Sequence, residues 1–189
     1  MRKYWLIGIP DCGKATLGEL AAQHLQISYY NTDMMTMSRI FTDEDMYYFP
    51  LAMSRLFYKE QIVVVSDLAK DDSPAIIATG AEVGLMPDCV EVMRSMGTII
   101  HLRRDADMIL EELKTKNTGG MWVDVKEGTQ TSTSQKALEE YAKELERYEL
   151  VADYSMDNNG SVQEGLEKLI SLIQTIETQL PQGEDPGNM

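Results

Sequence analysis

The stretch Tyr4–Thr16, which reads YWLIGIPDCGKAT, decides the fold of this chain. Its first half is short and almost wholly apolar, as expected for a β-strand buried on both faces of a parallel sheet. A turn with two glycines and a proline follows, and apolar residues then recur at helical spacing from about Lys14 to Gln26. The stretch therefore predicts a buried strand, a glycine-containing loop and a helix in direct succession.

The loop in this stretch fits the phosphate-binding pattern G-x-x-x-x-G-K-[ST] at every position except the last, which is Ala15. Glycines let backbone N–H groups converge on phosphate oxygens, and the lysine brings positive charge to the terminal phosphates. A tight strand-to-helix turn without a ligand is the alternative, and Ala15 keeps it open. We expect the phosphates of a nucleotide such as ATP to be held by Gly8, Pro10, Asp11, Cys12, Gly13, Lys14, Ala15 and Thr16.

Two residues of the loop are unusual for a site that binds a nucleotide with Mg²⁺. A Ser or Thr in place of Ala15 would put its hydroxyl on the metal, which a methyl group cannot do. Thr16, one position later, is the candidate metal ligand. A carboxylate about 4 Å from a phosphate charge would cost about 4 kcal/mol at an effective dielectric constant of 20. We therefore expect the side chain of Asp11 to point away from the phosphates.

Further short apolar runs predict four more strands, at residues 27–30, 74–79, 97–102 and 151–156. Helical patterns fill the gaps between these runs. Strands that alternate with helical segments of ten or more residues indicate βαβ units, in which helices cover both faces of a parallel sheet. The chain is thus predicted to be an α/β domain of three layers.

Two segments depart from this alternation. Residues 114–134 contain several glycines and a run of Ser and Thr with no apolar period, so we expect a long loop that acts as a lid. A disordered insertion is the alternative interpretation. The last residues are rich in Pro, Gly and acidic side chains, so we expect one domain over residues 1–177 and a flexible tail at 178–189.

Composition narrows the classes of partner. The chain has 189 residues, with 17 basic and 31 acidic side chains and a net charge of −14, which opposes binding to nucleic acid or to anionic lipid surfaces. The sequence contains no run of about 18 consecutive apolar residues, which is the length that a membrane-spanning helix requires. The two cysteines, Cys12 and Cys89, lie far apart and have no metal-binding spacing, so a reducing cytoplasm is expected. A small anionic ligand stays possible, since it is recognised by local groups.

The order of these features resembles the shikimate kinase family over most of the chain, from about Tyr4 to Ile176. Tyr30–Asp33 (YNTD) is similar to the family's Asp-x-Asp segment, Ile76–Glu82 (IIATGAE) to its strand that ends in three glycines, and Tyr148–Asp153 (YELVAD) to its segment before the last strand. The resemblance implies the P-loop NTPase fold, with a five-stranded parallel sheet of order 2-3-1-4-5. It also implies a mobile lid at residues 114–134 and ATP-dependent phosphorylation, with Mg²⁺, of a hydroxyl on a small-molecule acceptor.

The resemblance also implies roles for individual residues. Lys14 would stabilise the transferred charge, and Asp33 would orient the acceptor hydroxyl as a general base. Asp33 could instead be the N-cap of the helix that follows it. Asn31 stands where the family has a second aspartate that assists the metal. The implied acceptor-binding residues are Asp33, Gly80, Ala81 and Glu82.

The family's arginines, which grip the carboxylate of shikimate, have no counterparts in register. Phe49 is followed by Pro50 where the first arginine is expected, residues 114–134 contain no arginine, and Glu144 stands at the third position. Each missing arginine deprives a bound carboxylate of charge-assisted hydrogen bonds that stabilise it by about 1.5–3 kcal/mol. We therefore expect an acceptor other than shikimate. Two alternatives stay open: a catalytically weak protein that binds a nucleotide or metabolite as a sensor or partner, and a scaffold with a vestigial loop. The sequence leaves the oligomeric state undetermined.

Overall fold

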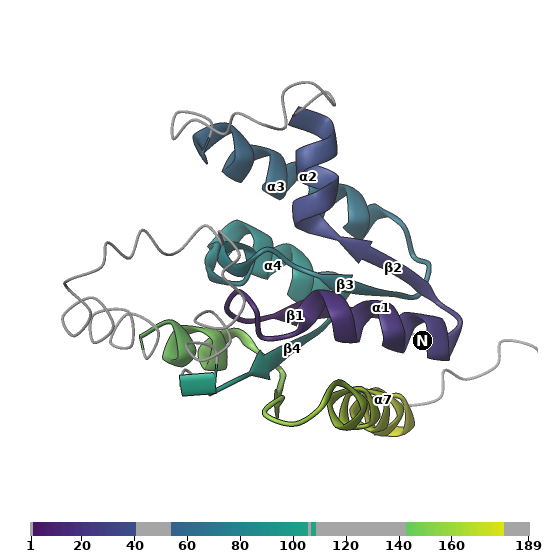
Figure 1. Cartoon of the computed structure of the whole chain (residues 1–189). Coiled ribbons are helices and arrows are strands. Elements are labelled where there is room, and N and C mark those ends of the chain that lie inside the picture. Colours follow the sequence, from purple (N-terminus) through teal and green to yellow (C-terminus); the bar gives the residue numbers. More distant parts are fainter. Residues whose placement is uncertain (1, 41–53, 106, 109–142, 180–189) are drawn as a thin grey trace, which may run out of the picture.

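The computed structural model describes residues 2–40, 54–105, 107–108 and 143–179 (Figure 1). Residues 143–151 form a helix that follows the undescribed segment. The other elements are β1 (Lys3–Ile7), α1 (Lys14–Leu25), β2 (Ser28–Asn31), α2 (Thr32–Ile40), α3 (Ser54–Lys70), β3 (Ala75–Ala78), the 3-10 helix η3 (Ala81–Leu85), α4 (Pro87–Met96), β4 (Gly97–Arg103), β5 (Tyr154–Asp157) and α7 (Val162–Gln179).

The five strands form one parallel sheet in the order β2-β3-β1-β4-β5, as predicted. Every residue of β1 is buried, because this strand lies at the centre of the sheet and has helices on both of its faces. β5 begins three residues later than predicted. The helix at 143–151 continues through Val151, and the Ala152 N–H donates to the Tyr148 carbonyl at 2.9 Å, which closes the helix before the strand starts.

Helices cover the sheet on both sides and complete the three predicted layers (Figure 1). α1 and α7 pack against each other on one face, and α3 and α4 pack against each other on the opposite face. α2 lies on α3 and extends this second layer beyond the edge strand β2. Val64 and Val65 of α3 and Leu17 of α1 are among the fully buried side chains that join the helices to the sheet.

Parallel strands place the starts of all their following segments at the same edge of the sheet, where ligands of open α/β sheets bind. The loop at residues 8–13 follows β1, Asp33 follows β2, and Gly80 follows β3. The fold therefore brings the predicted phosphate loop and the predicted acceptor residues to one edge, on the left in Figure 1.

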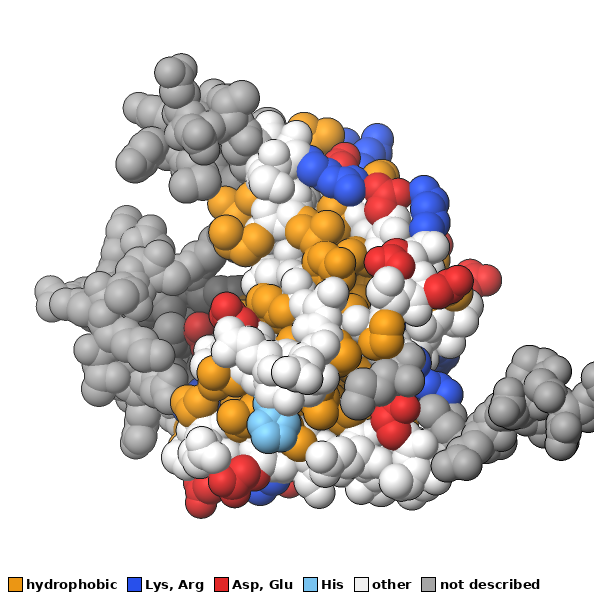
Figure 2. All heavy atoms as spheres, turned by 90° about the vertical axis from the view of Figure 1, so that its right-hand side faces the viewer, with side chains coloured by type: hydrophobic (Ala, Val, Ile, Leu, Met, Phe, Trp, Pro, Cys, Tyr) orange, Lys and Arg blue, Asp and Glu red, His pale blue; other side chains and the backbone are white. Residues whose placement is uncertain are grey.

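Figure 2 shows the face on the right-hand side of Figure 1, where basic side chains lie beside acidic ones. Within the described residues, no helix has the length and hydropathy needed to cross a bilayer. The predicted lid at 114–134 lies outside the described residues, and so do Phe49 and Pro50. α7 runs to Gln179, two residues past the domain boundary expected at residue 177.

Candidate functional site

Two glycines set the shape of the loop between β1 and α1. Gly8 has φ 141° and Gly13 has φ 98°. Residues that carry a side chain rarely adopt these backbone angles. Space is also lacking, since a Cβ on Gly8 would lie 2.6 Å from the Leu102 carbonyl oxygen, and one on Gly13 would lie 2.5 Å from Asn158 Nδ2. Glycine is therefore required at both ends of the loop for it to lie this close to β4 and to the segment after β5.

The N-terminus of α1 offers hydrogen-bond donors to a ligand. Its N-cap residue is Gly13, no side chain caps the helix, and the first turn holds no acidic residue. The first N–H groups of an α-helix have no partners within the helix, and the helix dipole is positive at this end. This uncapped end, framed by the glycine loop, fits a nucleotide phosphate in charge and in hydrogen bonding.

Lys14, the first residue of α1, is buried beneath the loop. Its ammonium donates to the carbonyl oxygens of Gly8 at 2.7 Å and Ile9 at 2.6 Å, and it lies 3.7 Å from Cys12 Sγ. The lysine thus ties the loop together from within. A bound phosphate would compete with the two carbonyls for the same ammonium.

Asp11 and Ala15, the two unusual residues of the loop, lie on different segments: Asp11 in the loop itself and Ala15 on α1. Asp11 is exposed, with φ 57°, and its backbone carbonyl accepts a hydrogen bond from Arg104 Nη1 at 3.1 Å. Ala15 and Thr16 are exposed on the first turn of α1, so the Thr16 hydroxyl is accessible to a ligand. Its role as a metal ligand stays a prediction. Within the described residues, no group of three His, Cys, Asp or Glu side chains could hold a metal ion.

Asp33 lies in the first turn of α2, but it does not cap this helix. Asn31 takes the capping role, because its Oδ1 accepts the Met34 N–H at 3.1 Å. The Asp33 carboxylate instead accepts a hydrogen bond from Gln61 Nε2 of α3 at 2.5 Å. The N-cap interpretation of Asp33 is therefore wrong, and its side chain is free to serve the site.

The surroundings of Asp33 tune its acidity. Burial raises the pKa of this carboxyl, and the nearby Glu82 raises it further, whereas Lys14 and the hydrogen bond from Gln61 lower it. A general base works best when its pKa lies close to the working pH, so a raised pKa favours proton acceptance. Asp33 follows β2 at the edge of the sheet where the phosphate loop follows β1, so the predicted base lies on the same side of the sheet as this loop.

The acceptor segment after β3 is fitted closely to Asp33. The Gly80 N–H donates to Thr32 Oγ1 at 2.9 Å, which joins this segment to the start of α2. A Cβ on Gly80 would collide with Asp33 Oδ1 and lie 2.7 Å from Gln61 Nε2. A side chain at position 80 would therefore have to displace the carboxylate or the amide. The structure therefore brings Gly80 and Asp33 together, and their role in binding an acceptor stays a prediction.

Tyr148, on the helix at 143–151, contacts both the acceptor segment and β4. Its hydroxyl donates to the Ala81 carbonyl at 2.6 Å, and its ring packs on the buried imidazole of His101, with ring centroids 5.1 Å apart. His101 Nδ1 in turn lies 3.2 Å from Glu149 Oε1. The sequence pattern did not assign these contacts. The YELVAD segment included Tyr148 in the resemblance, but it predicted none of its contacts.

Asn158 supports the phosphate loop and was also missed. It follows β5, is buried, and donates from Nδ2 to the Cys12 carbonyl at 2.9 Å. Its amide lies where a Cβ on Gly13 or on Gly165 of α7 would stand. No sequence pattern relates this asparagine to a loop so far away along the chain, so only the fold reveals the contact.

Comparisons with known proteins agree with this geometry. The sequence model described as shikimate kinase matches residues 10–174. A shikimate kinase of Caldicellulosiruptor bescii is 30% identical over 125 residues, which cover 62% of this chain and 67% of that protein. A shikimate kinase of Francisella tularensis subsp. holarctica is 24% identical over 178 residues, which cover 94% of this chain and 97% of that protein.

Solved structures show the same fold. Shikimate kinase from Acinetobacter baumannii in complex with shikimate has a TM-score of 0.74 at 18% identity, and the match covers 96% of each chain. Shikimate kinase from Aquifex aeolicus has a TM-score of 0.73 at 18% identity and covers 94% of this chain and 99% of its own. The family model spans most of the chain, and the sheet order and the phosphate loop agree with it. The chain therefore belongs to the shikimate kinase family, a family of small-molecule kinases.

Proposed function

We propose that this chain transfers the γ-phosphoryl group of ATP to a hydroxyl of a small molecule other than shikimate. The observation that carries the proposal is the half-buried carboxylate of Asp33, at the edge of the sheet where the phosphate loop also begins. It lies against Gly80 of the acceptor segment and close enough to Lys14 that the lysine lowers its pKa. A general base between a phosphate site and an acceptor site suits phosphoryl transfer to a hydroxyl.

Each described group has a role in such a transfer. The free N–H groups at the start of α1 and the ammonium of Lys14 bind and neutralise the phosphates. Asp33, fixed by Gln61, orients the acceptor hydroxyl and takes its proton. Mg²⁺, when bound with ATP, neutralises charge on the phosphate oxygens, and Thr16 is the residue of the loop that would contribute to holding it. Catalysis then comes from positioning and electrostatics.

Among the described residues, the positions that the resemblance assigns to the acceptor carry no positive group that would suit a shikimate carboxylate. Glu82 and Glu144 stand where the family has a glycine and an arginine. A carboxylate ligand needs donors or positive charge, which neither glutamate supplies.

A second candidate is a protein that binds the nucleotide without transferring its phosphate. Ala15 favours this candidate, since it removes the usual hydroxyl ligand of the metal. The two carbonyls that hold the Lys14 ammonium favour it too, because the lysine must leave them to reach a terminal phosphate. The free and buried Cys12 and Cys89 support a further proposal, that the protein works in the reducing cytoplasm.

Calorimetric titration with ADP and ATP, each with and without Mg²⁺, tests these candidates. The kinase proposal expects saturable binding that Lys14→Ala abolishes. It also expects transfer from ATP to at least one member of a panel of polyols, amino alcohols and cyclic acids, and loss of this transfer in Asp33→Asn with ADP binding retained. Nucleotide binding without transfer to any acceptor would support the second candidate, and no binding at all would indicate a vestigial loop.

The exclusion of shikimate has its own test. Titration of shikimate into the protein saturated with ADP should give no binding at micromolar concentration. Binding of shikimate with micromolar affinity would overturn this part of the proposal and leave the kinase activity standing.

A further inference from the structure

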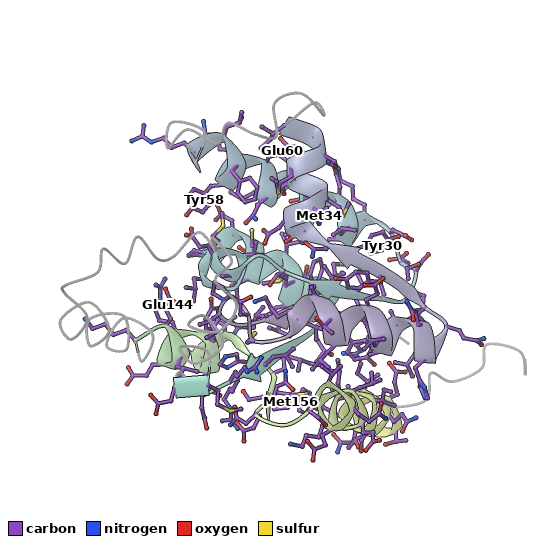
Figure 3. All side chains as sticks on the ribbon, viewed as in Figure 1. Tyr30, Met34, Tyr58, Glu60, Glu144 and Met156 are labelled. Carbon is purple, nitrogen blue, oxygen red and sulfur yellow. The ribbon has the colours of Figure 1, made fainter. Side chains whose placement is uncertain are left out.

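One buried tyrosine contacts both the acceptor segment and a histidine that lies against the phosphate loop. Tyr148, on the helix at 143–151, is fully buried, and its hydroxyl donates to the Ala81 carbonyl at 2.6 Å. Glu144 marks the same helix in Figure 3, on the left-hand side of the view, where the phosphate loop also lies. The roles proposed above for the phosphate loop and for Asp33 do not explain this tyrosine.

The hydrogen bond from Tyr148 holds the acceptor segment at one of two points. Ala81 begins η3, and the residue before it, Gly80, donates its N–H to Thr32 Oγ1 at 2.9 Å. Gly80 also lies so close to Asp33 that a Cβ at position 80 would collide with Asp33 Oδ1. A shift of the Ala81 carbonyl would therefore move the backbone that packs against the Asp33 carboxylate.

A buried histidine connects Tyr148 to the phosphate loop. The tyrosine ring packs on the imidazole of His101, which is 1% exposed, with the ring centroids 5.1 Å apart. His101 lies on β4, and its Cδ2 is 3.4 Å from the place that a Cβ on Gly8 would take. The Gly8 carbonyl in turn accepts a hydrogen bond from the Lys14 ammonium at 2.7 Å. The imidazole therefore lies between the tyrosine and the loop residue that holds the lysine.

A carboxylate holds the imidazole in one orientation. Glu149 Oε1 lies 3.2 Å from His101 Nδ1 and accepts a hydrogen bond from Arg103 Nη1 at 3.3 Å. Its other oxygen, Oε2, accepts one from Ser155 Oγ at 2.8 Å. Close-packed interiors transmit displacements, and a ring fixed in this way has little freedom to move aside. A change at Gly8 is therefore expected to reach Tyr148.

Phosphate binding supplies such a change. The Lys14 ammonium donates to the carbonyls of Gly8 and Ile9, and it must leave them to reach a terminal phosphate. The loop thus has two arrangements, one with the lysine on its own carbonyls and one with the lysine on the ligand. Energetic coupling between two sites needs an element with two discrete arrangements, which packed side chains can connect to the second site.

We propose that Tyr148 is a positioning residue that couples the phosphate loop to the acceptor segment, through its ring on His101 and its hydroxyl on Ala81. The inference rests on the proposed binding of a nucleotide and goes beyond it, because it makes the two halves of the site dependent on each other. A nucleotide in the loop then orders the segment that packs against Asp33. By linkage, a ligand that orders this segment strengthens nucleotide binding by the same factor.

The test uses ADP alone, so it needs no acceptor. Hydrogen exchange of the backbone amides is measured by mass spectrometry in peptides that cover residues 80–86, in the free protein and in protein saturated with ADP. Coupling between sites typically corresponds to a factor of about 5–150, so ADP should slow exchange in this segment about fivefold or more. Tyr148→Phe keeps the ring and removes the hydroxyl. It should abolish this slowing and leave the calorimetric affinity for ADP close to that of the parent protein.

Tyr4→Phe is the matched control. Tyr4 is also fully buried, and its hydroxyl donates to Glu177 of α7. It lies near the start of β1, whereas the phosphate loop follows the end of this strand. The control should therefore lose a comparable hydrogen bond and keep the effect of ADP on residues 80–86. His101→Asn is a second variant, which removes the ring between Tyr148 and Gly8 and should abolish the slowing as well.

The outcomes separate this inference from the proposed function. Slowing that persists in Tyr148→Phe, or that is missing from the parent protein when ADP is bound, overturns the inference and leaves the proposed function standing. Loss of the slowing in Tyr4→Phe as well would attribute it to lower stability and would also overturn the inference. A parent protein that binds no ADP would overturn the proposed function and the inference together.

Discussion

The contact between Asn158 and the phosphate loop allows a quantitative prediction for Asn158→Ala. The substitution removes the donor that satisfies the Cys12 carbonyl at 2.9 Å. A buried polar group left unsatisfied costs about 1–3 kcal/mol. The asparagine is also only 7% exposed and fills the space between Gly13 and Gly165, so its removal also weakens packing. We expect the free energy of unfolding to fall by about 2–3 kcal/mol.

Two assays measure this effect. For a chain of this size, each 1 kcal/mol shifts the melting temperature by about 2–4 °C, so thermal unfolding should move down by about 4–12 °C. Urea unfolding followed by circular dichroism gives the free energy directly. Asn159→Ala is the matched control, since Asn159 accepts the Asp105 N–H at 2.8 Å in an exposed position. This control substitution should cost about 0.5 kcal/mol.

The same change should affect nucleotide binding. Without Asn158 the loop is less fixed before the ligand arrives, so ADP must order it, and affinity should fall by up to about tenfold, which corresponds to 1.4 kcal/mol. Calorimetry on both variants separates this effect from a general decrease in stability. An Asn158→Ala protein that unfolds within about 0.5 kcal/mol of the parent would show that the Cys12 carbonyl has another partner, and the reasoning would be refuted.

Three further predictions concern other parts of the site. Gly80→Ala should displace the Asp33 carboxylate and lower the rate of phosphoryl transfer about 100-fold, with the affinity for ADP unchanged. The control Gly84→Ala crowds Ile7 and should lower only the free energy of unfolding, by about 1–3 kcal/mol. Tyr148→Phe should cost about 1 kcal/mol in urea unfolding, because the Ala81 carbonyl loses its donor. Burial lowers the pKa of His101 below the ordinary 6.5, so the unfolded chain takes up the proton first and stability should fall as the pH drops below about 6.5. Urea unfolding across this range should show a slope that His101→Asn flattens.

Much of the fold could be predicted because short stretches of sequence indicate its strands, loops and helices. A strand buried on both faces needs a short apolar run, and the loop and helix after it need glycines and helical spacing, all of which lie within Tyr4–Thr16. The start of β5 could not be predicted in the same way. Val151 and Ala152 suit a strand as well as a helix end, and the outcome depends on the hydrogen bond from Ala152 to Tyr148.

The same distinction applies to the candidate site, where residues in local motifs could be predicted and contacts between distant segments could not. Lys14 was identified because it belongs to a short motif whose spacing reflects its chemistry, whereas Gly80 was assigned only through the resemblance to the family. Two roles were open for Asp33, since an aspartate at a helix start can serve as a cap. The hydrogen bond from the Met34 N–H to Asn31 Oδ1 gives the capping role to Asn31, whereas the role of Asp33 as a base stays a prediction. Gln61 was missed because its contact with Asp33 joins two helices across a long separation.

The two halves of the site differ in how their chemistry depends on side chains. The phosphate half binds largely through backbone N–H groups and a helix end, which any sequence with glycines at positions 8 and 13 can present. In the proposed function the acceptor half binds through side chains, so a glutamate in place of the family's glycine at position 82 changes the charge and the hydrogen bonding of the acceptor site at once. A chain can therefore keep the phosphate chemistry of its family while its acceptor changes. Glu82→Gly should accordingly strengthen the binding of carboxylate ligands and leave the affinity for ADP unchanged, which calorimetric titration with shikimate and with ADP would measure.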